Sequence, residues 1–264
     1  MEHLKHPLAF MHKFNMYKLS GLLLEDDDLS SIARAYGASR KELEKLESGF
    51  RRNIAEISAT LPAEGKPPAD PAAEILAVGD SITSDRESYV KILNHHWRKD
   101  PSRQMLDSAV SGDTTADLVK RFYSTVLNRE FQWAVLFIGT NDCRQLDVPG
   151  RISVLSLEEY KRNIRFISET LLERGKNLIQ VTLPPADNTR LKDLSPEANS
   201  IYTEQHIGKV NDFIREWAGE KGYPVADLAR AVERQGRDVL GPDGLHLNSA
   251  GQRLICELLY DLLP

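Results

Sequence analysis

Glu74-Ile75-Leu76-Ala77-Val78-Gly79-Asp80-Ser81 is the stretch that decides the fold of this chain. Its apolar run predicts a buried strand, and the glycine with two polar residues after it predicts a sharp turn into a helix. A serine at such a turn exposes its hydroxyl group at the start of the helix. Ser81 is therefore either a helix cap, a common role for serine, or a nucleophile that needs a neighbouring general base. The tripeptide Gly79-Asp80-Ser81 alone does not separate these two roles.

After this strand the chain alternates between short apolar runs and amphipathic segments. The predicted strands are Glu74–Val78, Gln104–Val110, Trp133–Ile138, Asn177–Leu183 and Tyr223–Ala226. The predicted helices lie near 85–99, 113–128, 157–174, 203–221 and 251–262. Short strands interleaved with helices indicate a parallel, five-stranded sheet that helices cover on both faces. Because ligands of such sheets bind at the carboxyl ends of the strands, we expect residues 74–264 to form one α/β domain with its site at that edge.

Residues 1–62 have a different pattern and are predicted to form a small helical extension. Apolar residues recur at helical spacing before Gly37, which stops a first helix, and a second helix is predicted from Ser39 to Ala59. The proline-rich stretch Leu61–Asp70 precludes a helix, so we place a linker at 63–73. These helices cannot bury a large core alone. We expect them to cap the active site or to form a contact between two copies of the chain.

The composition is that of an ordinary soluble globular protein, with 41% of the 264 residues apolar and 28% charged. The formal net charge of −5 gives no case for a polyanionic partner, since phosphate binding needs concentrated lysine and arginine. Cys143 and Cys256 do not make a disulfide framework. No run approaches the roughly 20 apolar residues of a membrane span, and the first residues lack the apolar region of a signal peptide. We expect a cytoplasmic protein with no membrane or nucleic-acid partner.

Three later segments place polar residues directly after a predicted strand or before the last helix. They are Ser111-Gly112-Asp113-Thr114-Thr115, Ile138-Gly139-Thr140-Asn141-Asp142 and Asp243-Gly244-Leu245-His246. The backbone N–H of Gly112 and the side-chain amide of Asn141 can donate to a developing oxyanion, although each segment alone also suits a turn or a helix cap. Asp243 can accept Nδ1–H of His246 and leave Nε2 to act as a base. Together, in this order, the elements meet the geometry for acyl transfer.

Over roughly residues 74–262, the chain resembles the SGNH/GDSL hydrolase family of serine esterases and lipases. Gly79-Asp80-Ser81 is similar to the nucleophile block of that family, Gly112 to its glycine block, Gly139-Thr140-Asn141-Asp142 to its asparagine block and Asp243-x-x-His246 to its last block. The stretch 111–115 looks most like the arylesterase and acyl-thioesterase branch. One departure is Leu247, where many members carry proline. This departure alters the stiffness of the loop and should not remove catalysis.

The resemblance implies a flavodoxin-like three-layer α/β/α sandwich and a specific mechanism. Ser81 would attack the ester carbonyl, His246 would remove and return the proton, and Asp243 would orient His246. The backbone N–H groups of Ser81 and Gly112 and the side chain of Asn141 would hold the oxyanion. No metal or organic cofactor is implied, and the partner would be a small-molecule ester.

The sequence does not name that ester. The loop from Cys143 to Ser156 and the loop from Leu183 to Asn199 are expected to shape the pocket, and both mix apolar with charged residues. We favour carboxylic esters with short acyl groups. The alternatives are a carbohydrate O-acetyl group, an acyl thioester or a lysophospholipid at the same site. A non-catalytic ester- or sugar-binding module is an alternative of a different class, against which the intact Ser81, Asp243 and His246 speak.

Two features of the extension suggest other functions. The spacing Ala33-x3-Gly37-x5-Leu43 fits a helix-turn-helix, but the acidic and basic residues of its second helix nearly cancel, so DNA would not be attracted. The acidic run Glu25-Asp26-Asp27-Asp28 lacks the spaced ligands of a calcium loop, and a solvated helix start is the better interpretation.

Overall fold

The predicted parallel sheet is present and has five strands. The computed structural model describes residues 7–20, 24–62, 74–100, 103–194, 199–235 and 238–263, so the predicted linker 63–73 lies outside the described residues. The strands are β1 (Glu74–Gly79), β2 (Gln104–Asp107), β3 (Trp133–Phe137), β6 (Asn177–Val181) and β8 (Val225–Ala226). Their order is β2-β1-β3-β6-β8, and all neighbouring pairs are parallel. This is the flavodoxin-like order, which confirms the expected fold class.

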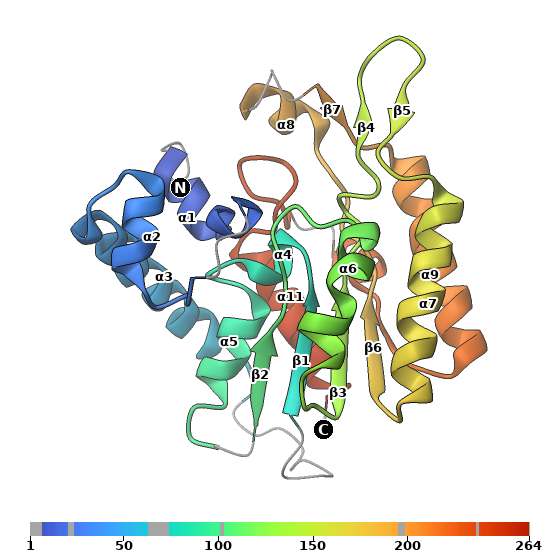
Figure 1. The fold of residues 1–264 in the computed structure, drawn as a ribbon, viewed down its shortest axis with the longest axis horizontal. Coiled ribbons are helices and arrows are strands. Elements are labelled where there is room, and N and C mark those ends of the chain that lie inside the picture. The colour runs from blue at the N-terminus through green and yellow to red at the C-terminus, as the bar shows by residue number, and fades with distance from the viewer. Residues whose placement is uncertain are drawn as a thin grey trace.

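Helices cover both faces of the sheet, as Figure 1 shows. On one face α6 (Thr115–Phe122), α7 (Leu157–Glu173) and α9 (Glu204–Lys221) pack in a row. On the other face α5 (Tyr89–His96) packs against α11 (Ser249–Tyr260), which also contacts α10 (Leu228–Gln235). A π-helical turn, Tyr123–Leu127, continues α6, and the short helix α4 (Ser81–Ser84) follows β1. The three layers of the predicted sandwich are therefore present.

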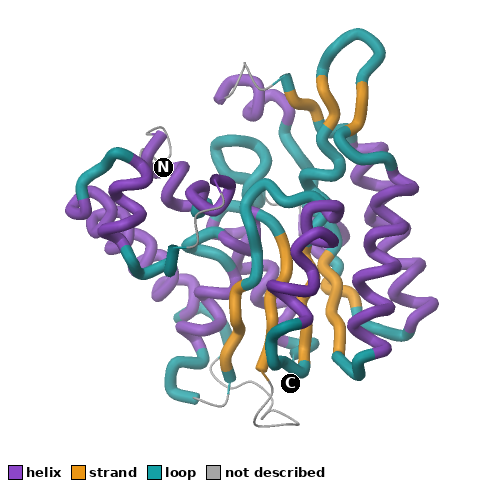
Figure 2. Tube along the Cα trace, viewed as in Figure 1, coloured by secondary structure: helices purple, strands orange, loops and turns teal. Residues whose placement is uncertain are grey.

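β2 ends at Asp107, three residues before the predicted end at Val110. The N–H groups of Ser108 and Val110 nevertheless donate to the carbonyl oxygens of Ala77 and Gly79, at 2.9 and 3.2 Å. The chain thus follows β1 beyond the regular ladder and brings its next loop to the carboxyl end of that strand. The loops after the strands gather at this edge, the upper edge of the sheet in Figure 2.

The N-terminal extension is helical, as expected. Both predicted helices are present as α2 (Leu29–Tyr36) and α3 (Arg40–Ser58). Gly37 ends α2 in the left-handed conformation, with φ of 63°, and Ser39 with Glu42 forms a capping box at the start of α3. The helix α1 (Pro7–Lys13) and the 3₁₀ turn η2 (Met16–Ser20) come before them and were not predicted. α3 packs against α5 of the same chain, so this helix is joined to the α/β domain.

A small antiparallel sheet extends above the carboxyl edge and was also not predicted (Figure 1). It consists of β4 (Gln145–Leu146), β5 (Ile152–Ser153) and β7 (Ser200–Ile201), in the order β5-β4-β7. The short helix α8 (Asn188–Leu194) lies beside β7. β4, β5 and α8 lie in the two loops that were expected to shape the pocket, and β7 follows directly after the second loop.

The hydrophobic core lies between the parallel sheet and its helices. The central strands supply completely buried side chains such as Leu76, Val135 and Ile179. A second, smaller cluster of buried residues joins η2, α2 and α3 around Tyr17, Ile32 and Leu43. Among the helices of the described part of the chain, none is long and apolar enough to cross a membrane.

Candidate active site

Ser81 begins α4 directly after β1, but it is not the cap of that helix. The cap is Asp80, whose Oδ1 accepts the N–H of Ile82 at 3.0 Å. Gly79 has to lack a side chain because a Cβ atom at this position would collide with the carbonyl oxygen of Phe137 in the neighbouring strand β3. The hydroxyl group of Ser81 is therefore left for a partner other than its own helix.

That partner is His246. Oγ of Ser81 lies 2.7 Å from Nε2 of His246, and Nδ1 of the same ring lies 2.6 Å from Oδ2 of Asp243. Oδ1 of Asp243 also accepts the backbone N–H groups of Leu245 and His246, each at 3.0 Å. Burial acts to raise the pKa of Asp243, but the neighbouring His246 and these hydrogen bonds outweigh burial and hold the pKa below its usual value. Asp243 is thus an ionised group that can orient an imidazole ring and stabilise its protonated form.

The loop that carries Asp243 and His246 is fastened at several points. The N–H of Gly241 donates to the carbonyl oxygen of His246 at 2.7 Å, which closes the loop on itself. Arg190 of α8 binds the carboxylate of Asp238 at 2.7 Å and points a second nitrogen at the carbonyl oxygen of Leu240, 3.4 Å away. The loop therefore holds its two functional side chains in a fixed position relative to β1.

Two of the three candidate oxyanion donors, Gly112 and Asn141, lie in loops that are joined by a hydrogen bond. Gly112 lies exposed in the loop after β2, and Asn141 follows β3. Nδ2 of Asn141 donates to the carbonyl oxygen of Asp113 at 2.9 Å, which holds the two loops together. The neighbouring Asp142 accepts the N–H of Thr115 at 3.0 Å, and burial raises the pKa of this carboxyl to about 6. Both donors thus lie in loops at the carboxyl edge, where Ser81 also lies.

The structure adds an aromatic residue that sequence reasoning missed. The ring of Phe14, only 1% exposed, is stacked on the imidazole of His246, with 3.9 Å between the ring centroids and 24° between the planes. The ring of Phe10 meets the same imidazole edge-on at 5.8 Å. The hydroxyl group of Ser111 donates to the backbone carbonyl of Phe14. The only hint in the sequence is an aromatic pair at helical spacing, which says nothing about where the pair packs.

The segment around Phe14 is anchored to the loop after α4. Lys13 is buried and forms ion pairs with Asp85, at 2.9 Å, and with Glu87. Burial acts to lower the pKa of Lys13, but the two carboxylates outweigh it and raise the pKa above its usual value. The side-chain amide of Asn15 donates to the carbonyl oxygen of Ser84 at 2.7 Å. Two ion pairs and a neutral hydrogen bond therefore fix the extension beside α4.

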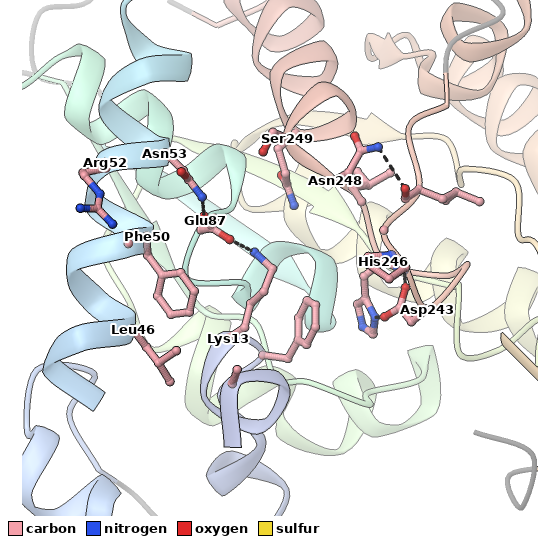
Figure 3. Close-up of a pocket in the computed structure, with 18 of the residues that line it drawn as sticks. Lys13, Leu46, Phe50, Arg52, Asn53, Glu87, Asp243, His246, Asn248 and Ser249 are labelled. Carbon is pink, nitrogen blue, oxygen red and sulfur yellow. Dashed lines mark hydrogen bonds and ion pairs between the residues drawn. The ribbon is translucent and has the colours of Figure 1, made fainter. Parts of the chain in front are cut away.

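A cavity of about 740 Å³ adjoins this site. It lies between α1 and α3 on one side and the loop 238–249 on the other, and Asp243 and His246 are part of its wall (Figure 3). Among the described residues of the two loops expected to shape the pocket, only Arg190 lines this cavity. The rest of the wall comes from the extension and the segment 238–252, together with Glu87. The cap over the active site that the sequence suggested for the extension stays a prediction.

The acidic run 25–28 is engaged within the protein. Asp28 caps α2 by accepting the N–H of Ser31, and Asp26 accepts the hydroxyl group of Tyr17 at 2.6 Å and lies 3.3 Å from Nζ of Lys18. Over the described ranges, no three or more His, Cys, Asp or Glu side chains are grouped so that they could hold a metal ion.

Known proteins of similar fold are ester-cleaving enzymes. A lipase/acylhydrolase from Enterococcus faecalis shares 25% sequence identity and covers 71% of this chain and 93% of its own, with a TM-score of 0.59. An acetyl xylan esterase, at 18% identity, covers 71% of this chain and 98% of its own with a TM-score of 0.58. A variant of an acetylxylan esterase from Geobacillus stearothermophilus, also at 18% identity, covers 71% and 92% with a TM-score of 0.57. The last two similarities show the fold alone.

The sequence itself matches one family. No curated protein sequence matches the chain significantly. The profile of the GDSL-like Lipase/Acylhydrolase family matches residues 77–254, more than half of the chain, and leaves the N-terminal helices outside the matched segment. This profile does not distinguish between branches of the family. The chain belongs to the GDSL-like lipase/acylhydrolase family and is therefore a carboxylic ester hydrolase.

Proposed function

We propose that this protein hydrolyses carboxylic esters with short acyl groups through an acyl-enzyme on Ser81. The observation that carries the proposal is the chain of hydrogen bonds from Ser81 through His246 to Asp243, at 2.7 and 2.6 Å. A serine hydroxyl is a poor nucleophile until a base takes its proton, and this arrangement supplies the base and the group that orients it.

In the first half of the reaction, Oγ of Ser81 attacks the ester carbonyl while Nε2 of His246 takes the hydroxyl proton. The tetrahedral oxyanion would accept hydrogen bonds from the backbone N–H groups of Ser81 and Gly112 and from the amide of Asn141. The intermediate then collapses, its bond to the alkoxy oxygen breaks, and His246 gives its proton to the leaving alcohol. The acyl group remains on Ser81 as an ester.

In the second half, water replaces the alcohol. His246 takes a proton from the water molecule, the resulting hydroxide attacks the acyl-enzyme, and the carboxylic acid leaves as Oγ of Ser81 regains its proton from His246. Asp243 keeps its negative charge throughout and stabilises the imidazolium in both halves. The two half-reactions balance without an oxidant, a reductant or a cofactor.

Short acyl groups are favoured because there is little free space at the nucleophile. Ser81 and His246 are each 9% exposed, and the ring of Phe14 covers one face of the imidazole. An acetyl group adds only two heavy atoms beyond the carbonyl oxygen, so it makes the smallest demand on this space.

The test is covalent labelling with a fluorophosphonate, combined with hydrolysis of 4-nitrophenyl acetate. The wild-type chain is expected to be labelled once and to release 4-nitrophenolate, and Ser81→Ala is expected to lose both. Ser84→Ala, which changes another buried serine of α4, is the matched control and should keep the label. A wild-type chain that takes no label would show a binding module instead of an enzyme and would overturn the proposal.

A further inference from the structure

The cavity of about 740 Å³ beside His246 has a mostly apolar wall. Its apolar residues come from both sides, namely Leu8, Leu46 and Phe50 of the extension and Leu240, Pro242 and Leu247 of the loop 238–249. Figure 3 shows Leu46 and Phe50 facing the cavity across from Asp243 and His246. The volume is within the usual range for small-molecule sites, about 300–1,000 Å³. Because the family profile begins at residue 77, the extension side of this wall is a feature of this chain beyond the matched segment.

Several charged groups of the wall are neutralised by partners, whereas Lys45 and Arg52 of α3 also line it and are exposed. Lys13 pairs with Glu87, which also accepts the amide of Asn53 at 2.5 Å. Arg190 binds Asp238 at 2.7 Å. A charged ligand would have to compete with these pairs, whereas a neutral, apolar body would gain from burial on the leucine and phenylalanine side chains. The apolar side chains and these paired charges therefore favour an apolar group in the part of the cavity that they line.

Acyl transfer also fixes where each half of an ester must lie. The histidine that takes the proton of the serine gives it to the leaving alcohol, so the alcohol oxygen must come within hydrogen-bonding distance of Nε2 of His246. The carbonyl oxygen must instead point at the oxyanion donors. Ser81, Gly112 and Asn141 are the candidates for that role, and none of them lines the cavity. Since His246 does line it, an alcohol that receives its proton from this imidazole can extend toward the cavity.

We propose that this cavity is the leaving-group subsite and that it selects esters of bulky, largely apolar alcohols, with an aromatic or long alkyl body. The inference rests on the proposed ester hydrolysis at Ser81 and names the alcohol that this site accepts. Phe14 connects the cavity with the proposed base, because it lines the cavity and its ring is stacked on His246. The extension thus contributes to substrate choice and not only to coverage of the site.

Gly49 of α3 provides a test that leaves Ser81, Asp243 and His246 unchanged. This residue lines the cavity, and an added Cβ atom would meet no atom within 4 Å. Gly49→Trp is expected to fill part of the cavity. The comparison uses two acetates, because both give the same acetyl-enzyme and differ only in the alcohol. The variant should raise KM for 1-naphthyl acetate about tenfold and change KM for ethyl acetate less than about twofold.

Three controls accompany this comparison. Ser48→Trp places the same indole at an exposed position of α3 that does not line the cavity, and should leave both KM values unchanged. Gly49→Ala adds only one methyl group at the wall of the cavity and should raise KM for 1-naphthyl acetate by the smallest factor of the Gly49 variants. Gly49→Leu repeats the test with a smaller side chain, in case the indole disturbs the helix, and should raise KM for 1-naphthyl acetate by a smaller factor.

Two outcomes would overturn the inference. One is a Gly49→Trp or Gly49→Leu variant that changes KM equally for both acetates, or for neither of them. The other is a changed preference between 4-nitrophenyl acetate and 4-nitrophenyl hexanoate, which share one alcohol, because the acyl chain would then occupy the cavity. In both cases the fluorophosphonate label on Ser81 would persist, so the proposed function would stand. Loss of that label in the wild-type chain would instead remove the proposed function.

Discussion

Asp80 occupies an unusual position for a carboxyl group. It is 1% exposed, and its Oδ2 has no hydrogen-bond partner among the described residues. Burial raises the pKa of Asp80 to about 7, although the N–H of Ile82 and the nearby His246 act against that rise. In the unfolded chain the pKa of an aspartate is about 4. Because the folded state holds this proton more tightly, Asp80 contributes stability below about pH 4 that is lost as the pH rises through 7.

Asp80→Asn is therefore expected to make the free energy of unfolding depend less on pH between about pH 4 and pH 8. The amide keeps the oxygen that caps α4 but carries no charge to bury. Wild type and variant should have similar free energies of unfolding in urea near pH 4, and the variant should be more stable at pH 8, by on the order of 3–4 kcal/mol. Two parallel curves between pH 4 and pH 8 would show that Asp80 titrates normally in the folded state.

Single residues differ in how well the sequence indicates their place. Ser81, Asp243 and His246 could be singled out because each lies where the alternation of strands and helices puts the carboxyl edge, and the structure joins their side chains by hydrogen bonds. Their catalytic roles stay a prediction. Phe14 could not be found this way, because it lies in the turn between α1 and η2, where no pattern indicates a packing partner, and only the complete fold selects His246 as its neighbour.

At the scale of elements, replacing glycine by alanine is expected to have opposite effects on stability at two positions of the extension. Gly49 lies inside α3 with open space around it, and Gly37 ends α2 with φ of 63°. Gly49→Ala should stabilise the protein by about 0.5–1 kcal/mol, because alanine is the better helix former. Gly37→Ala should destabilise it by about 1 kcal/mol, because an alanine side chain strains the left-handed conformation. Thermal unfolding of both variants measures the two shifts, and shifts of the same sign would contradict this account.

Elements were predictable in proportion to their length. The apolar strands and long helices were found within a few residues, since their periodicity repeats over several turns or pairs. The strands β4, β5 and β7 have two residues each, which is too short for any alternation to be seen. β8 is equally short and is the exception, because it lies within the predicted strand Tyr223–Ala226. The helix α1 and the turn η2 are nearly as short, and their position depends on Lys13 and Asn15 binding residues of α4 and its following loop.

At the scale of the whole molecule, the buried ion pairs of Lys13 join the extension to the α/β domain. Lys13→Met leaves Asp85, which is completely buried, without its cation, and such a break costs about 3–5 kcal/mol. Hydrogen exchange should show α1 opening while the strands of the parallel sheet stay protected. Lys18→Met is the matched control: its ion pair with Asp26 is partly exposed, and its loss should cost less than about 1 kcal/mol.

Partial recovery of α1 protection in the double variant Lys13→Met/Asp85→Asn would tie the effect to the unpaired carboxylate. Unchanged protection of α1 in the single variant would mean that the extension is held by its apolar contacts instead. Contact between two copies of the chain through these helices, the alternative role considered for the extension, stays a prediction that the oligomeric state in solution would test.

The contact between Phe14 and His246 joins two residues that the ribosome makes at very different times. A ribosome that adds about 5–20 residues per second makes Phe14 roughly ten to fifty seconds before it makes His246. During that interval Ser81 has already been made without its proposed base, and the rings of Phe10 and Phe14 have no imidazole to contact. Under the proposed mechanism, ester cleavage begins only after the loop 238–249 has been made and has folded back beside Phe14. A nascent chain that stops short of this loop is then expected to show no hydrolysis.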